Sequence, residues 1–261
     1  MAASCSCLCR RVVIDEAGSV HLEKKGLRSI PSGAKGPRVK ELWVQDNSIA
    51  GFPPELCCWE NAELIYATNN ELAYIEGKVA ASWVSLQELN LSGNAALSKL
   101  PDECAAWVDL RQLYCNDLPL LTSLPDSSVR SWTRLKILHA NSCSLDSLPE
   151  DIGHCTSLTM ISLNNNKLQG LPASIANWSR VEKIFLNDNL LTELPPLEGM
   201  AALEKLNVNS NRLIALPVSI AVLPSLEASS PAQSTVCRSL PCVRGASFSL
   251  FVSIPGGIRH E

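Results

Sequence analysis

One apolar pattern recurs eight times along the chain after residue 39, at steps of 22 to 25 residues. A fixed period in this range is typical of a repeat array, in which each unit stacks on its neighbours and shares one continuous core. The stretch Leu158–Pro172 shows the pattern most clearly, as L-x-x-L-x-L-x-x-N-x-L-x-x-L-P. We number positions within each repeat from its opening residue, and these residues are Val39, Ala62, Leu86, Leu110, Leu135, Leu158, Val181 and Leu203.

Positions 4 and 6 are apolar in every copy, and a weaker opening copy from Ala17 adds a ninth. Two apolar residues two apart predict a short strand with one buried face. We therefore expect an α/β solenoid: a curved parallel sheet on the concave face and short helical, 3-10 or irregular segments on the convex face. Nine strands at roughly 4.8 Å each would make a sheet about 40 Å across. Position 4 holds Val20, Leu42, Ile65, Leu89, Leu113, Leu138, Ile161, Ile184 and Leu206.

Position 9 is asparagine in six copies. An amide both donates and accepts hydrogen bonds, so it can satisfy backbone groups left unpaired where a strand turns away. We interpret this column as a structural ladder, formed by Asn47, Asn70, Asn94, Asn166, Asn189 and Asn211, with Lys25, Leu118 and Cys143 as exceptions. Repeats three and four also carry one extra residue before Leu97 and Leu121, and we expect a local bulge there.

Five of the six tryptophans lie three residues before the next copy begins. Their regular spacing predicts a buried ladder under the convex surface, with a packing role and not a binding role. A proline after the second Leu ends strand pairing in most repeats, and Glu76 takes its place once. The five tryptophans are Trp59, Trp83, Trp107, Trp132 and Trp178.

The same columns divide the chain into four parts. Residues 1–11 read as a flexible, cysteine-rich N-terminus, and residues 12–38 as an N-terminal capping repeat. Residues 39–226 hold the array of eight repeats. From residue 227 the pattern stops, and residues 227–261 are rich in Ser, Pro, Gly, Cys and Arg. We expect this divergent tail to be disordered, with the C-terminal cap missing.

Charge and hydropathy restrict the partners. The formal net charge is −4 and no run of Lys or Arg exceeds two, which disfavours nucleic-acid binding. The sequence contains neither a secretory signal nor an apolar stretch that spans a bilayer. We therefore expect a cytoplasmic protein in which most of the eleven cysteines are free thiols.

A cysteine cluster, Cys5, Cys7 and Cys9, precedes Arg10-Arg11 and has three interpretations. The first is a flexible, reduced N-terminus. The second is S-acylation beside a small basic pair, which would attach the protein peripherally to a membrane. The third is metal binding, which lacks a fourth ligand and standard spacing, so we predict no metal site.

No motif for catalysis or for cofactor binding appears in the sequence. His139, Cys143 and Asp146 are close enough to suggest a nucleophile with its base. The repeat opposes that interpretation, because His139 falls on a solvent-facing strand position and Cys143 on the inward asparagine position. We predict a protein that is not an enzyme and has no cofactor.

Strand residues that flank the buried positions should face the concave side. Large, rigid aromatic rings there bury area at little entropy cost, as protein-recognition surfaces do. The predicted partner-binding residues are Trp43, Tyr66, Tyr114, His139 and Phe185. The alternative is that single exposed aromatics are ordinary and have no partner. We expect the asparagines at position 7, from Asn141 to Asn209, to be generic solvated sheet surface.

These columns resemble the leucine-rich repeat superfamily over roughly residues 17–226. The 23-residue L-P-x-x-I form is similar to the intracellular Ras-group branch, and it occurs at Leu148–Ile152, Leu171–Ile175 and Leu216–Ile220. The resemblance implies a curved scaffold that binds other proteins, in some members in small-GTPase or kinase signalling. It does not select the partner.

Two function classes follow. The first is a monomeric, non-enzymatic scaffold or adaptor that binds a protein partner on its concave face in intracellular signalling. The second is a regulatory or substrate-receptor subunit of a kinase, phosphatase or ubiquitin-ligase system. An appended domain in a longer transcript would favour the second class.

Overall fold

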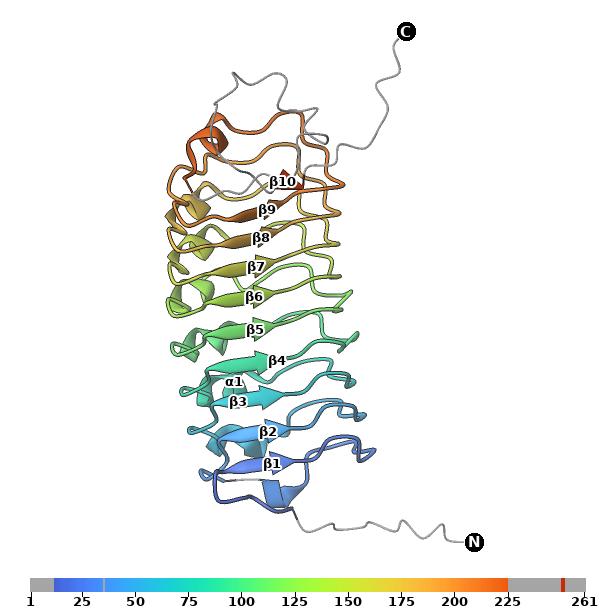
Figure 1. The fold of residues 1–261 in the computed structure, drawn as a ribbon. Helices are drawn as coiled ribbons and strands as arrows, with labels where there is room; N and C mark the ends of the chain where they lie inside the picture. Colours follow the sequence, from blue (N-terminus) through green and yellow to red (C-terminus); the bar gives the residue numbers. More distant parts are fainter. Residues whose placement is uncertain (1–11, 35, 225–249, 252–261) are drawn as a thin grey trace, which may run out of the picture.

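The computed structural model describes residues 12–34, 36–224 and 250–251, and its strands stack in chain order in one parallel sheet (Figure 1). Position 4 of each strand pairs with position 4 of the next, so Val20 lies beside Leu42, and Leu42 beside Ile65. The predicted solenoid with a parallel sheet is confirmed. The strands are β1 (Ser19–His21), β2 (Glu41–Trp43), β3 (Leu64–Tyr66), β4 (Glu88–Asn90), β5 (Gln112–Tyr114), β6 (Ile137–His139), β7 (Met160–Ser162), β8 (Lys183–Phe185), β9 (Lys205–Asn207) and β10 (Leu250–Phe251).

The last strand comes from the predicted tail. β10 pairs in parallel with β9, with Leu250 opposite Leu206 and Phe251 opposite Asn207. The expectation of disorder is therefore wrong at residues 250–251, because they add a strand to the exposed edge of the sheet. The remaining residues of 227–261 lie outside the described part of the chain, and there the expectation stays a prediction.

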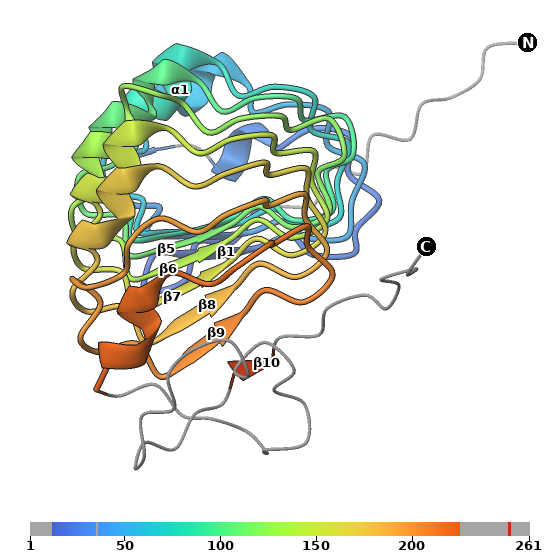
Figure 2. The same ribbon diagram turned by 90° about the horizontal axis from the view of Figure 1, so that it is seen from above.

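Short helical turns form the wall opposite the sheet (Figure 2). Five of these turns begin directly after a proline. Each of these prolines is the N-cap residue of its turn and has an extended backbone conformation. Where Glu76 replaces proline, the segment is an α-helix. The elements are η1 (Ser32–Ala34), η2 (Pro54–Cys58), α1 (Gly77–Ser82), η3 (Asp102–Ala106), η4 (Val129–Ser131), η5 (Glu150–His154), η6 (Ala173–Asn177) and η7 (Val218–Val222).

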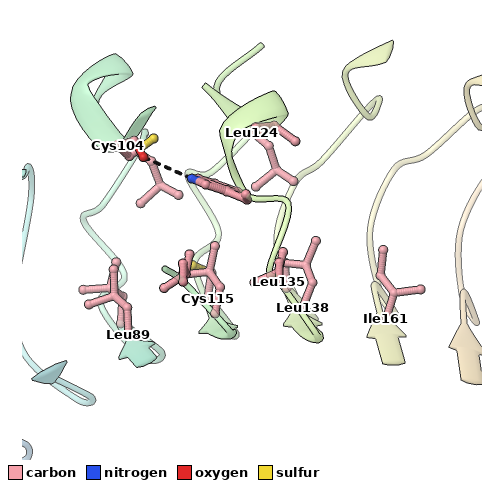
Figure 3. Packing of buried hydrophobic residues seen from close by; sticks show 14 of the residues in the cluster. Leu89, Cys104, Cys115, Leu124, Leu135, Leu138 and Ile161 are labelled. Atoms are coloured by element: carbon pink, nitrogen blue, oxygen red, sulfur yellow. Dashed lines mark hydrogen bonds between the residues drawn. The ribbon is translucent and has the colours of Figure 1, made fainter. Parts of the chain in front are cut away.

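The core lies between sheet and turns (Figure 3), and the predicted tryptophan ladder forms its convex side. Trp83 stacks on Trp107 at 6.0 Å between ring centroids, and Trp107 on Trp132 at 6.2 Å. The indole N–H of Trp107 donates to the Ala80 carbonyl at 2.9 Å, one repeat earlier. The ladder therefore joins repeats by hydrogen bonds as well as by apolar contact.

Trp83 is the exception in this ladder. Its buried indole N–H has no hydrogen-bond partner among the described residues. Instead, the ring packs edge-on against Phe52, with the centroids 5.2 Å apart. This repeat therefore gains aromatic contact where its neighbours gain a hydrogen bond.

The position 9 asparagines bond backbone groups of two repeats at once. Asn166 is typical: its Oδ1 accepts the Leu145 N–H at 3.0 Å, and its Nδ2 donates to the carbonyls of Ala140 at 2.8 Å and Leu163 at 3.0 Å. Each buried amide therefore satisfies one donor of the preceding repeat and acceptors on both sides. The same pattern holds for Asn47, Asn70, Asn94, Asn189 and Asn211.

Leu118 and Cys143 stand at position 9 in place of asparagine, and in both cases the preceding repeat carries the extra residue. In repeat three, the predicted bulge is a tight turn in which Leu97 N–H bonds the Asn94 carbonyl at 2.9 Å. Leu121 N–H bonds the Leu118 carbonyl at 3.0 Å in repeat four. In the other repeats, the corresponding N–H donates to the asparagine of the next repeat. With that donor already satisfied, the next position 9 is free to be Leu118 or Cys143.

Candidate protein-binding face

The five predicted partner-binding residues share the concave side of the sheet. Each stands at position 5, between the two inward residues of its repeat, and each is half-buried. We call the residues at positions 3, 5 and 7 of the strands the concave floor. By strand register, Tyr66, Asn90, Tyr114 and His139 follow one another across β3 to β6.

Three rings form a stack at the N-terminal end of the concave floor. His21 lies 5.7 Å from Trp43, and Trp43 lies 4.2 Å from Tyr66, with interplanar angles of 18° and 9°. Each ring covers part of its neighbour, which explains why Trp43 and Tyr66 are half-buried, while His21 at the end of the stack stays exposed. The stack fixes the ring orientations before any partner arrives.

The middle of the concave floor, on β5 to β7, contains no Asp, Glu, Lys or Arg. Tyr114 meets His139 edge-on at 5.2 Å, and His139 Nε2 lies 3.3 Å from the sulfur of Met160. Burial lowers the pKa of His139, so its ring is neutral at physiological pH. Phe185 lies apart from the other rings, between Ser162 and Asn207 on the adjoining strands.

Two glutamates also belong to the concave floor, and the sequence analysis missed them. Glu41 Oε2 accepts hydrogen bonds from Trp43 Nε1 at 3.2 Å and from Ser19 Oγ at 2.9 Å. Glu88 accepts a hydrogen bond from the Tyr66 hydroxyl. Burial, the hydrogen bond and the Glu88 charge raise the pKa of Tyr66. Strand alternation could have placed both glutamates on the concave side, since position 3 faces the same side as position 5.

The position 7 asparagines differ from the expectation of a generic solvated surface. Asn116 Oδ1 accepts the Asn141 backbone N–H at 3.0 Å, and Asn141 Oδ1 accepts that of Asn164 at 2.8 Å. The series continues to Asn187 and Asn209, and these side chains are half-buried. The expectation was wrong because parallel stacking leaves this N–H facing the amide one repeat back. A second ladder therefore stiffens the C-terminal half of the floor.

His139 and Cys143 do not form a nucleophile and base. The Cys143 thiol donates to the Cys115 carbonyl at 3.1 Å, while the His139 ring contacts Met160. Burial raises the pKa of Cys143 to about 11, and that of Cys155 to about 12. Thiols this weakly acidic carry almost no thiolate near neutral pH, so they are poor nucleophiles.

Over the residues that the structure describes, no group of three His, Cys, Asp or Glu side chains could hold a metal ion. No helix in that same part is long and apolar enough to cross a membrane. Cys5, Cys7 and Cys9 lie outside the described residues, so acylation there stays a prediction.

The described residues thus form a stack of parallel repeats whose concave floor carries ordered aromatic rings. A family model of the leucine-rich repeat matches residues 156–213. Together with the nine stacked repeats, this match shows that the chain is a leucine-rich repeat protein. No curated protein matches the chain in sequence.

The solved structures that share the fold include the following two. A leucine-rich repeat protein of Leptospira interrogans aligns with a TM-score of 0.61 and 24% identity over 81% of this chain. A plant peptide hormone receptor, RGFR1, solved in complex with RGF2, aligns with a TM-score of 0.63 and 24% identity over 73% of this chain. The aligned parts make up 59% of the Leptospira chain and 31% of the receptor chain.

Proposed function

We propose that this chain is a non-enzymatic scaffold that binds a protein partner on its concave floor. The observation that carries the proposal is the row of half-buried rings on adjacent strands, above all the Trp43–Tyr66 pair at 4.2 Å. Aromatic side chains dominate the binding energy of protein interfaces. Here the rings are already ordered, so a partner would lose little side-chain entropy when it binds them.

The fold supports the same use of the concave floor. The two asparagine ladders form hydrogen bonds with backbone groups just after the strands, and the inward apolar side chains pack against those of neighbouring repeats. The concave side chains are therefore the ones free to contact another molecule. The plant receptor with the same fold was solved in complex with RGF2, which is consistent with binding by such a scaffold.

The Ras-group branch, a role in intracellular signalling and a small GTPase or kinase as partner remain parts of the proposal. They are supported by the L-P-x-x-I repeats, such as Leu171–Ile175. A cytoplasmic, monomeric protein fits the buried free thiols of Cys104, Cys115, Cys143 and Cys155, which favour a reducing compartment.

Affinity capture with a double variant tests the proposal. Trp43→Ala with Tyr66→Ala removes the ring pair, whereas Tyr74→Ala removes an exposed tyrosine outside the concave floor. Loss of two central aromatic contacts should reduce recovery of the specific partner by at least about tenfold, with no effect of Tyr74→Ala. Identical partner lists from folded wild-type and double-variant protein would remove the proposed site.

A further inference from the structure

The concave floor is acidic over its first five strands. Positions 3, 5 and 7 of β1 to β5 hold Glu23, Glu41 and Glu88 and neither Lys nor Arg. Glu23 is already bonded to His21 at 2.8 Å. Glu41 and Glu88 form no ion pair with any described residue, although each accepts a hydrogen bond from an aromatic side chain.

These two carboxylates stand on either side of β3. The strand register places Glu41 and Glu88 on opposite sides of Leu64, two strand spacings apart. That separation is roughly 10 Å. Both charges contribute to the raised pKa of Tyr66, so its hydroxyl lies within the field of both groups. We use the name notch for the group of floor residues formed by Glu41, Leu64 and Glu88 together with the Trp43–Tyr66 stack, whose two rings donate hydrogen bonds to the two carboxylates.

Two cations lie at position 2 of repeats in this part of the chain, Lys40 before β2 and Arg111 before β5. Lys40 Nζ lies 3.5 Å from Glu63, outside the pair of floor carboxylates. Arg111 is an exposed position 2 residue at the start of β5. Neither neutralises Glu41 or Glu88, so the notch keeps uncompensated negative charge.

The other half of the concave floor has the opposite charge. Positions 3, 5 and 7 of β6 to β9 hold Lys183 and Lys205 and no acid. The rim beside them carries Glu182 and Glu204, so the contrast is confined to the floor itself. The first half therefore selects for positive charge on a partner, and the second half does not.

We propose that the protein partner seats an arginine or lysine side chain in the notch between Glu41 and Glu88. This inference rests on the proposed function and identifies the contact segment as basic. Leu64 and the ring stack would support the alkyl part of the side chain, while the carboxylates receive its N–H donors. A guanidinium fits best, because its planar fork presents donors on opposite edges. A metal ion is disfavoured, because no group of three His, Cys, Asp or Glu side chains among the described residues could hold one.

Selection from a displayed random-peptide library tests this directly. Peptides of about twelve residues suit the test, because an extended segment of that length spans the roughly 40 Å of the concave floor. The full chain is immobilised as wild type, as Glu41→Gln with Glu88→Gln, and as Lys136→Gln with Lys167→Gln, two exposed residues outside the concave floor. Glutamine keeps the hydrogen-bond acceptors for Trp43 and Tyr66 and removes only the charge. Only peptides that bind the wild type and are not retained by Trp43→Ala protein are counted, and we call these peptides Trp43-dependent.

Wild type should enrich Arg or Lys among the Trp43-dependent peptides. The Glu-to-Gln pair should abolish that enrichment, and the Lys-to-Gln pair should leave it intact. Replacing the selected cationic residue by Ala should weaken peptide binding about tenfold. Trp43-dependent peptides without basic enrichment, or enrichment that survives the Glu-to-Gln pair, would overturn the notch and leave the scaffold standing. Absence of any Trp43-dependent peptide would overturn both.

Discussion

Single residues at position 9 decide how neighbouring repeats are joined. An asparagine there serves a backbone donor one repeat back, as Asn166 serves Leu145. Where the preceding repeat satisfies that donor by its own turn, as at Leu97, an amide would bury an acceptor without a partner. Leu118 and Cys143 are therefore compatible with their neighbours and are not defects of the array.

Replacing Leu118 by the asparagine that most repeats have at position 9 should destabilise the protein. Leu118→Asn restores the asparagine column, yet it should lower the free energy of unfolding by about 3–5 kcal/mol, because the apolar packing of the buried Leu118 is lost and the new Oδ1 finds no free N–H. Denaturant unfolding measures the change. For comparison, Asn166→Ala should lose on the order of 3 kcal/mol because it removes the side-chain partner of four backbone groups, while Asn177→Ala, at an exposed site, should change little. A Leu118→Asn protein more stable than wild type would contradict the explanation that the turn at Leu97 removes the need for asparagine at position 9 of the next repeat.

The buried thiols predict a loss of stability at high pH. The folded pKa of Cys143 is about 11, against 9.0 for a free thiol. Its contribution is fully present below pH 9 and is lost as pH rises toward 11, because the unfolded chain ionises first. The stability of wild type relative to Cys143→Ser should fall by about 1.4 kcal/mol per pH unit in that window. A difference independent of pH from 9 to 11 would refute the burial of this thiol.

At the scale of elements, the convex tryptophan ladder is stabilised by two unlike contacts. Trp107 and Trp83 are both fully buried and stack on each other, but only the Trp107 indole has a carbonyl acceptor. Comparing the stability of variants at these two positions therefore separates the contribution of the hydrogen bond from that of ring packing. The convex wall is therefore more than an apolar filling between turns.

Trp107→Phe should destabilise the protein more than Trp83→Phe, by about 1 kcal/mol, since both lose similar ring area and only the first leaves the Ala80 carbonyl unbonded. Paired denaturant titrations with unchanged m-values would establish the difference. Equal losses would mean that the Ala80 bond contributes nothing to stability.

At the scale of the whole molecule, the sequence predicted the stacking because positions 4 and 6 can only be buried together if copies lie side by side. It did not predict contacts that depend on two repeats at once. The Asn116–Asn141 bond and the link between Leu97 and Leu118 exist only when adjacent copies are in register. The concave placement of Tyr66 followed from alternation, whereas its bond to Glu88 depends on a side chain of the next strand.

We propose that the concave floor, and not the convex turns, binds another protein. A photoreactive benzophenone side chain introduced singly at Tyr114, Phe185, Arg130 or Ala173 tests it, since the first two positions lie on the concave floor and the last two are exposed on convex turns. After irradiation with the captured partner, cross-linked adducts should form from positions 114 and 185 and be absent from 130 and 173. Adducts from the convex positions alone would contradict the account.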